Sequence, residues 1–250
     1  MKLPYDEVGS GPGVVLLHAG IADRTMWAEH LDPLAEAGYR VVAVDLPGFG
    51  EAPVPPGEQA AWMDVLQTMD ELSIERAALV GNSFGGAVAL RAAFVAPDRV
   101  SALVLVSAPA PDLEPSAKLE AVWEQEEAAL ERGDIDAAVD AVVNAWTLSD
   151  APQELRDRVA AMQRRAFALG DPPTTEAPDP VEQDPEALAR LEVPTLVAAG
   201  ERDMGDFLDG AEALAQTLPR ARHAVIEGAG HLAPLETPEE FRRLVLAFLG

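Results

Sequence analysis

The sequence predicts an α/β protein in which helices cover both faces of a mostly parallel sheet. Short apolar segments that end in glycine or a polar residue recur along the chain, and helical patterns lie between most of them. Continuous apolar runs suit strands that are buried on both faces of a parallel sheet. Alternation of such strands with helices is typical of this fold class. A chain of 250 residues is long enough for one domain with a large core.

The apolar segments define the predicted strands and the periodic segments define the predicted helices. We expect strands at 13–18, 40–45, 76–81, 100–106, 194–200 and 222–228. We expect helices between or after them at 23–37, 58–72, 85–96, 208–217 and 237–248.

One long interval, between Val106 and Pro194, interrupts this alternation. It contains three helical patterns, at 116–132, 134–147 and 152–169. Asp134 and Asp150 are candidate N-caps, and Pro152 suits a first helical turn. The following stretch, "GDPPTTEAPDPVEQDP", is rich in proline and acidic residues and is expected to be a loop. We therefore predict a core at 1–108 and 186–250, and a helical cap at 109–185.

Composition excludes several classes of function. The chain has no cysteine, which rules out disulfides, thiolate nucleophiles and cysteine-based zinc sites. Its four histidines form no His-x-x-x-His pair, so we expect neither a metal nor a cofactor. A net charge of −25 opposes binding to nucleic acid, and the expected partner is a small-molecule substrate. The oligomeric state is left open.

The longest apolar runs and the N-terminal segment indicate the compartment. Runs such as "VSALVLVSA" are far shorter than a membrane span, so no membrane association is expected. The segment "MKLPYDEVGSGP" has no apolar core like that of a signal peptide. The expected location is the cytoplasm.

The motif "GNSFGG" places Ser83 between a predicted strand and a predicted helix. Gly-x-Ser-x-Gly alone is a modest signal, but a nucleophile elbow requires this strand–turn–helix setting. The turn holds the serine in a strained backbone conformation, and Gly81 and Gly85 leave room where helix and strand approach each other. Ser83 is therefore the candidate nucleophile.

A serine hydroxyl needs a base, and His231 is the best candidate. It follows the last predicted strand on a glycine-flanked loop, "GAGHLAPLETPEEF". His223 lies inside a strand pattern, and His30 is expected on the outer face of a helix. His18 ends a strand and is expected to brace the neighbouring loop without transferring protons.

The base needs an acid that fixes its tautomer and stabilises the imidazolium. Asp203, in "GERDMGDF" after the strand at 194–200, is our choice. Asp206 and Asp209 are nearby rivals, and Asp112 is a more distant one. The chain order serine, aspartate, histidine is the order expected on this fold.

An oxyanion hole requires preorganised backbone N–H groups. One should be the N–H of Phe84, the residue after the nucleophile. The other should come from "HAGIADRTMW", where Gly20 is the first choice and Ile21 the second. Simple turn chemistry is the alternative explanation of this loop.

Taken together, these stretches resemble the α/β-hydrolase superfamily over nearly the full chain. The resemblance rests on "LLHAG", "VVAVDLPGFGEA", "LVGNSFGGAVAL", "LVAAGERD" and "GAGHLAPLETPEEF". It implies an eight-stranded, mostly parallel sheet with a helical cap inserted after the sixth strand, and the site roles already assigned. The chain departs from the family pattern at Ala19, at Ala52 and in its short N-terminal segment, where an edge strand is expected to be missing.

Serine at the elbow argues against relatives that carry aspartate there, such as haloalkane dehalogenases and epoxide hydrolases. The predicted activity is hydrolysis of a small to medium, partly apolar carboxylic ester through an acyl-serine intermediate. A C–C bond hydrolase or enol-lactonase of a ring-cleavage pathway is the first alternative. A ligand-binding or sensor protein without turnover is the second.

The cap is expected to set substrate choice. Candidate pocket residues are Ile21, Trp123, Trp146 and Leu232. Aromatic residues at helical spacing also pack cores, so that alternative stays open for the cap residues. Arg164 and Arg165 could bind a substrate carboxylate, although a solvated helix face is the simpler interpretation.

Overall fold

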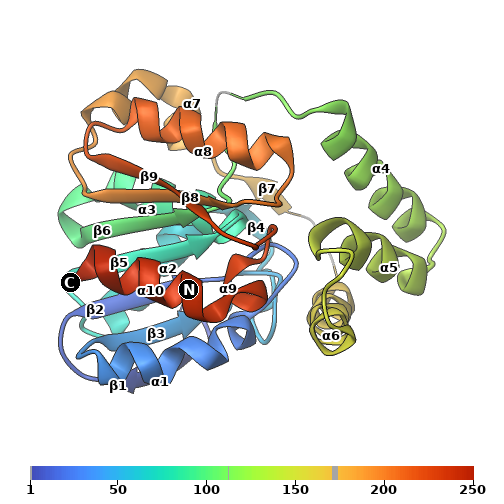
Figure 1. Ribbon diagram of the computed structural model, residues 1–250, viewed down its shortest axis with the longest axis horizontal. Coiled ribbons are helices and arrows are strands. Elements are labelled where there is room, and N and C mark those ends of the chain that lie inside the picture. Colours follow the sequence, from blue (N-terminus) through green and yellow to red (C-terminus); the bar gives the residue numbers. More distant parts are fainter. Residues whose placement is uncertain (1, 112, 171–173) are drawn as a thin grey trace.

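A seven-stranded sheet forms the centre of the protein, in the order β1-β3-β2-β5-β6-β8-β9 (Figure 1). The computed structural model describes residues 2–111, 113–170 and 174–250. The strands are β1 (Tyr5–Gly9), β2 (Gly13–Leu17), β3 (Arg40–Val44), β5 (Ala77–Asn82), β6 (Val100–Val106), β8 (Thr195–Gly200) and β9 (Ala221–Ile226). β1 runs antiparallel to β3, and the other neighbours are parallel.

The six predicted strands are confirmed within one or two residues at their ends, and β1 is the strand of the central sheet that was not predicted. The helix predicted at 58–72 begins later, at Ala61, because Gly57–Gln59 forms the strand β4. The sequence of β1, "YDEVG", carries exposed acidic residues and lacks an apolar run. As an edge strand with one neighbour, β1 needs less burial than a central strand. The sheet has seven strands, so the eight strands implied by the resemblance are one too many, as the short N-terminal segment suggested.

Helices cover both faces of the sheet, as predicted. α1 (Ala28–Glu36) and α10 (Pro238–Leu249) pack on one face, and α2 (Ala61–Glu71), α3 (Phe84–Val95) and α8 (Gly205–Thr217) pack on the other. The predicted helix at 23–37 begins instead with a 3₁₀ turn, Arg24–Trp27, before α1. Of the helices in the described ranges, none is both long and apolar enough to cross a membrane.

His30 is fully buried, and the prediction that it lies on an outer helix face is wrong. Its ring packs edge-on against Trp27 and Phe241, and its Nε2 lies 2.8 Å from the carbonyl oxygen of Pro234. The physical reason is that α10 covers α1, which turns this side of α1 into an interior surface. A single-helix pattern cannot reveal such a covering element.

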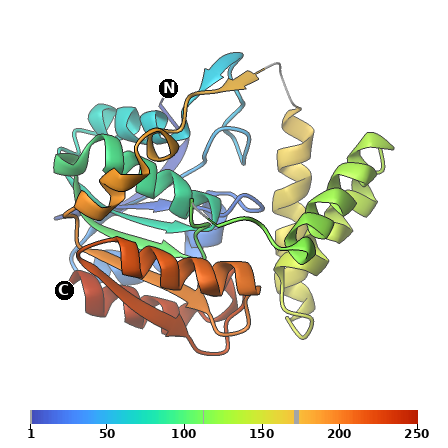
Figure 2. The same cartoon turned by 90° about the horizontal axis from the view of Figure 1, so that it is seen from above.

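The three helices predicted for the long interval are present: α4 (Ala117–Glu131), α5 (Ile135–Trp146) and α6 (Gln153–Leu169), and we call this group the cap helices. They form a group beside the layered core (Figures 1 and 2). Asp134 caps α5 by accepting a hydrogen bond from the N–H of Ala137. Asp150 does not cap α6, which begins after Pro152; it pairs instead with Arg202 of the core. The cap follows β6, the fifth strand of the central sheet, because β4 (Gly57–Gln59) belongs to a separate small sheet.

The acidic, proline-rich stretch after the cap is more structured than the predicted loop. It contains β7 (Thr174–Glu176), which pairs with β4, and α7 (Pro180–Gln183), after which a 3₁₀ helix spans Pro185–Arg190. Asp179 explains part of this order, because it caps α7 and forms an ion pair with Arg91 of α3. That partner is 88 residues away in sequence, so local composition could not predict it.

Parallel strands bring the predicted functional loops to one edge of the sheet. β2, β5, β8 and β9 all run in the same direction, so the segments after their carboxyl ends gather there. β2 lies between β3 and β5, which follow it in the chain, so the connections diverge on its two sides. Ligands of open α/β sheets bind at such a switch point, outside the carboxyl ends of the strands.

Candidate active site

Ser83 occupies a sharp turn between β5 and α3. Its φ of 54° and ψ of −118° lie in a region that a residue with a side chain rarely adopts. Such strain costs on the order of 1–3 kcal/mol and persists only where the surroundings hold it. The N–H of Ser83 donates to the carbonyl of Val106 at 2.8 Å, which ties the turn to the neighbouring strand.

The glycines around Ser83 permit this geometry. A Cβ on Gly81 would lie 2.3 Å from the carbonyl oxygen of Gly85. A Cβ on Gly85 would lie 2.2 Å from the carbonyl oxygen of Leu17. Both obstacles are backbone atoms, so only glycine allows α3 to begin this close to β2 and β5.

His231 and Asp203 form a buried pair at the same edge. The Nδ1 atom of His231 lies 3.1 and 3.2 Å from the two carboxylate oxygens of Asp203. The side chains are only 4% and 1% exposed, so bulk water competes little for this contact. The main-chain N–H of Met204 donates to the same carboxylate at 2.8 Å, and Asn82 donates to the carbonyl of His231 at 3.0 Å. Hydrogen bonds from Met204 and Asn82 thus hold Asp203 and His231 in place.

Two aromatic rings enclose the imidazole of His231. The ring centroids of Trp146 and Phe207 lie 4.5 and 4.3 Å from that of the imidazole. Trp146 comes from the cap and Phe207 from α8. Packing of this kind limits the orientations that the imidazole can adopt.

The rival aspartates occupy other positions. Asp206 accepts hydrogen bonds from the N–H and the hydroxyl of Ser116, at 2.7 and 2.8 Å, and so ties α8 to the start of the cap. Burial pushes the pKa of Asp206 upward, but the bonds from Ser116 outweigh this effect and lower it. Asp209 is exposed at the mouth of the cavity. Asp112 lies outside the described residues.

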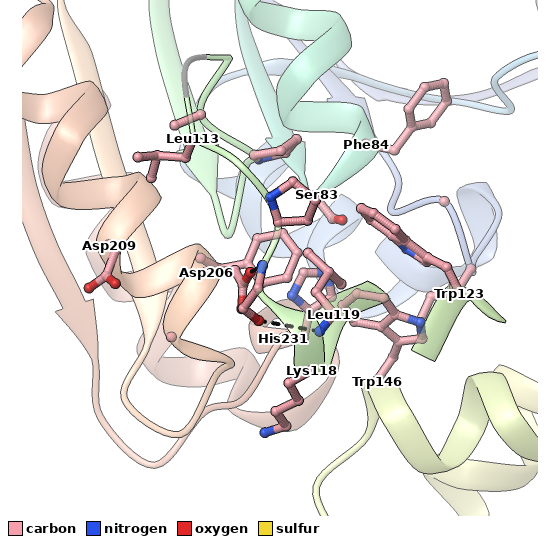
Figure 3. A pocket seen from close by; sticks show the side chains of 18 of the residues that line it. Ser83, Phe84, Leu113, Lys118, Leu119, Trp123, Trp146, Asp206, Asp209 and His231 are labelled. Carbon is pink, nitrogen blue, oxygen red and sulfur yellow. Dashed lines mark hydrogen bonds between the residues drawn. The ribbon is translucent and has the colours of Figure 1, made fainter. Parts of the chain in front are cut away.

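A cavity of about 760 Å³ connects Ser83 with the His231–Asp203 pair through the imidazole of His231 (Figure 3). Ser83 and His231 both line it, together with Gly20 and Phe84. Of the predicted pocket residues, Ile21, Trp123 and Trp146 also line it. The sequence analysis missed other apolar lining residues: Phe49, Pro109, Ala110, Leu113, Leu119 and Phe207. Several of them lie on segments that directly follow a strand, which is the signal that could have identified them.

Leu232 does not line this cavity, in contrast to the prediction. It is fully buried in the hydrophobic core, where it precedes the short helix α9 (Ala233–Glu236). The chain turns into the core directly after His231, so adjacent residues face different surroundings.

The loop after β2 meets the start of α3 at the cavity. A Cβ on Gly20 would lie 3.3 Å from the Cβ of Phe84, so the two segments are in close contact. The N–H of Phe84 belongs to the first turn of α3, where helical N–H groups have no partner within the helix. The N–H of Phe84 therefore has no partner within the helix, and Gly20 lies against the same residue.

His18 braces this loop from within the core. The N–H of Leu46 donates to Nε2 at 2.9 Å, so Nδ1 carries the ring proton and donates to the carbonyl of Ala19 at 2.8 Å. Burial lowers the pKa of His18, which keeps the ring neutral. The expectation that His18 holds the loop agrees with these two contacts.

The charged residues of the cavity wall are mostly acidic. They are Glu114, Glu126, Asp206, Asp209 and Lys118. Burial raises the pKa of Glu126, which lies on cap helix α4. Arg164 and Arg165 are paired elsewhere, with Asp136 and Asp23. Among the lining residues that the structure describes, Lys118 is the one lysine or arginine.

The sequence profile of the α/β hydrolase fold matches residues 12–238 of the chain. The chain belongs to this family. It is a hydrolase of this fold, and both the family and the fold class predicted from the sequence are confirmed.

Relatives of this α/β hydrolase include enzymes with different substrates. The 2-hydroxy-6-oxo-6-phenylhexa-2,4-dienoate hydrolase of Comamonas testosteroni is 31% identical and aligns with 98% of this chain and 90% of its own. The pimeloyl-[acyl-carrier protein] methyl ester esterase of Nitrosomonas europaea is 30% identical, with 96% of each chain covered. Among solved structures, the enol-lactonase from Burkholderia xenovorans LB400 matches with a TM-score of 0.81 at 26% identity, over 99% and 96% of the two chains.

Proposed function

We propose that the protein hydrolyses carboxylic esters through an acyl-serine intermediate, with Ser83 as nucleophile, His231 as base and Asp203 as acid. The observation that carries this proposal is the buried His231–Asp203 pair, whose imidazole lines the same cavity as a serine held on a strained elbow. A serine hydroxyl becomes a useful nucleophile when an adjacent base accepts its proton, and the base needs a third group to orient it.

Each proposed step uses one of these groups. His231 removes the proton from Ser83 Oγ as this oxygen attacks the ester carbonyl. The N–H groups of Gly20 and Phe84 stabilise the negative oxygen of the tetrahedral intermediate. As the C–O bond breaks, His231 gives its proton to the leaving alcohol. Water, activated by the same histidine, then releases the acid from Ser83.

The cavity wall favours a neutral, partly apolar substrate. Ile21, Trp123, Trp146 and Leu119 offer an apolar surface for an acyl or alcohol group. The wall contains four acidic side chains and one lysine, so a carboxylate on the substrate would be repelled overall. A neutral ester of small to medium size fits both features.

A second candidate activity comes from the relatives. The names of the C. testosteroni and B. xenovorans enzymes describe a hydrolase of a dienoate and an enol-lactonase. A dienoate carries a carboxylate, and the arginines Arg164 and Arg165 that could have bound one are paired with aspartates outside the cavity. We therefore place C–C bond hydrolysis and enol-lactone hydrolysis behind ester hydrolysis.

A matched substrate panel separates these activities. It pairs p-nitrophenyl esters of increasing acyl length with p-nitrophenyl hemisuccinate, an ester of similar size that carries a carboxylate, and adds a hydroxy-oxo-dienoate and an enol-lactone. We expect turnover of the neutral esters, with kcat/KM for the butyrate ester at least about tenfold above that for the hemisuccinate. Preferred turnover of the dienoate or lactone would replace the ester proposal, and binding without turnover would favour a ligand-binding role.

The remaining expectations belong to the same proposal. The substrate is a small molecule, and nucleic acid is not a partner, because a net charge of −25 repels phosphate backbones. We propose the cytoplasm as the compartment and residues 109–185 as a cap that shapes the pocket. Fractionation of the producing cells tests the first, and substrate preferences of cap variants test the second.

A further inference from the structure

The carboxylate of Glu236 bridges two segments that both contact His231. Glu236 ends α9, five residues after His231. Its Oε2 accepts a hydrogen bond from the N–H of Gly230 at 2.7 Å, and its Oε1 accepts one from the N–H of Leu148 at 3.1 Å. Gly230 directly precedes His231, and Leu148 directly follows the end of α5 in the cap.

The end of α5 packs on the same loop. A Cβ on Gly230 would lie 2.8 Å from the Cδ2 atom of Leu148, so there is no spare room between the cap and this loop. Two residues before Leu148, the ring of Trp146 packs on the imidazole of His231. A shift of this part of the cap would therefore reach the loop through Glu236, Leu148 and Trp146 together.

Electrostatics connects Glu236 to the proposed base as well. Burial is the largest influence and raises the pKa of Glu236, with Asp203 acting in the same direction. The N–H groups of Leu148 and Gly230 and the nearby His231 act against it and favour the ionised carboxylate. Arg202 is a further charged group that interacts with Glu236.

We propose that Glu236 is a positioning residue that joins the cap to the loop of His231, so that cap and base reach their working positions together. The proposal rests on the proposed function, because it gives His231 the role of base. Glu236 itself does not line the cavity and is not expected to touch the substrate.

Two substitutions separate the geometry of Glu236 from its charge. Glu236→Gln keeps the length but has one oxygen, so one of the two N–H groups loses its acceptor and the negative charge is lost. Glu236→Asp keeps the charge but is one carbon shorter, so it cannot reach both donors. A matched control is Glu29→Gln, which breaks the ion pair between Arg158 of α6 and Glu29 of α1, and so loosens another contact of the cap with the core, while leaving Gly230, Leu148 and Arg202 untouched.

The readouts are kcat and KM for a neutral p-nitrophenyl ester. We expect both Glu236 variants to lower kcat by about 10- to 100-fold, since small displacements of a catalytic group have effects of this order. KM should change by less than about threefold, because the substrate contacts remain. Glu29→Gln should retain kcat within about twofold, as expected for a surface pair.

A wild-type-like kcat in Glu236→Gln would overturn the proposal. An equal loss of kcat in Glu29→Gln would also overturn it, because the effect would then reflect general loosening of the cap. If Glu236→Gln fails to fold, the kcat of Glu236→Asp decides. The rate at which a fluorophosphonate labels Ser83 keeps the two proposals apart: an unlabelled wild-type protein contradicts the proposed function, whereas normal wild-type labelling with equal rates in both Glu236 variants contradicts the role of Glu236 alone.

Discussion

At the scale of single residues, Asp203 is the group whose proposed role depends most on one contact. Its carboxylate faces Nδ1 of His231 at 3.1 and 3.2 Å, whereas Asp206 binds Ser116. The sequence alone left these aspartates as rivals, because all of them follow the same strand. Their separation depends on where the start of α8 turns, which tertiary packing determines.

Asp203→Asn should lower kcat by on the order of 10⁴, because an amide no longer fixes the productive tautomer of His231 or stabilises its protonated form. Steady-state kinetics on a neutral ester measures the effect. Asp209→Asn, at an exposed position of the cavity wall, is the matched control and should retain most of the rate. A near-wild-type rate in Asp203→Asn would move the acid to another residue.

His30 predicts a pH dependence of stability. Burial is the main cause that lowers its pKa from 6.5 to about 4, with Arg242 and Arg158 acting in the same direction against Pro234 and Glu29. Below pH 6.5 the unfolded chain therefore binds a proton that the folded protein does not. The free energy of unfolding should fall as pH drops from 6.5 to about 4, by an amount on the order of 3 kcal/mol from this group.

Urea unfolding at a series of pH values tests this dependence in wild type and in His30→Gln. The glutamine can still donate to the carbonyl of Pro234 but does not titrate in this range. We expect the variant to lose less stability than wild type between pH 6.5 and about 4. Parallel curves for the two proteins would show that His30 does not titrate as described.

At the scale of elements, the turn from β5 into α3 is the feature that positions Ser83, the proposed nucleophile. A side chain at either glycine would collide with a different neighbour: at Gly81 with the start of α3, and at Gly85 with the end of β2. The motif predicted a turn and close packing, and the structure identifies the backbone atoms that require it.

Gly85→Ala should destabilise the protein by more than about 1 kcal/mol and remove most activity, because the new Cβ would lie 2.2 Å and 2.5 Å from the carbonyl oxygens of Leu17 and His18. Gly210→Ala in α8 is the matched control: its nearest neighbour is at 3.5 Å, and alanine favours the helix. Thermal unfolding and ester turnover of both variants measure the contrast. An active, stable Gly85→Ala protein would contradict the close-packing argument.

The elements that the sequence predicted well are those whose signal is local. Buried strands such as β5 and β6 could be predicted from their unbroken apolar runs. The helices of the cap could be predicted from their periodicity and, for α5, from its N-cap residue Asp134. β1, β4, β7 and α7 were missed because each depends on a distant partner, which is β3, β7, β4 and Arg91 respectively. The buried position of His30 was missed for the same reason, since α10 covers it.

At the scale of the whole molecule, the site is assembled from loops that follow four parallel strands and from the cap. Ser83, His231 and the predicted oxyanion donors lie far apart in sequence and line one cavity. The order of the motifs predicted that these residues lie close together, because the carboxyl ends of parallel strands meet at the same edge of a sheet. The wall of the cavity was less predictable: Leu232 faces the core, while Phe207 and Leu119 face the cavity. Which side of a loop or cap helix faces inward depends on the docking of the cap.

The measurement that tests the central claim most directly is labelling with a serine-directed fluorophosphonate, with the adduct located by mass spectrometry. The strained elbow and the buried His231–Asp203 pair predict one adduct on Ser83, formed rapidly in wild type and abolished in Ser83→Ala together with ester turnover. A folded wild-type protein that stays unlabelled, or a Ser83→Ala variant that still turns over esters, would contradict the account.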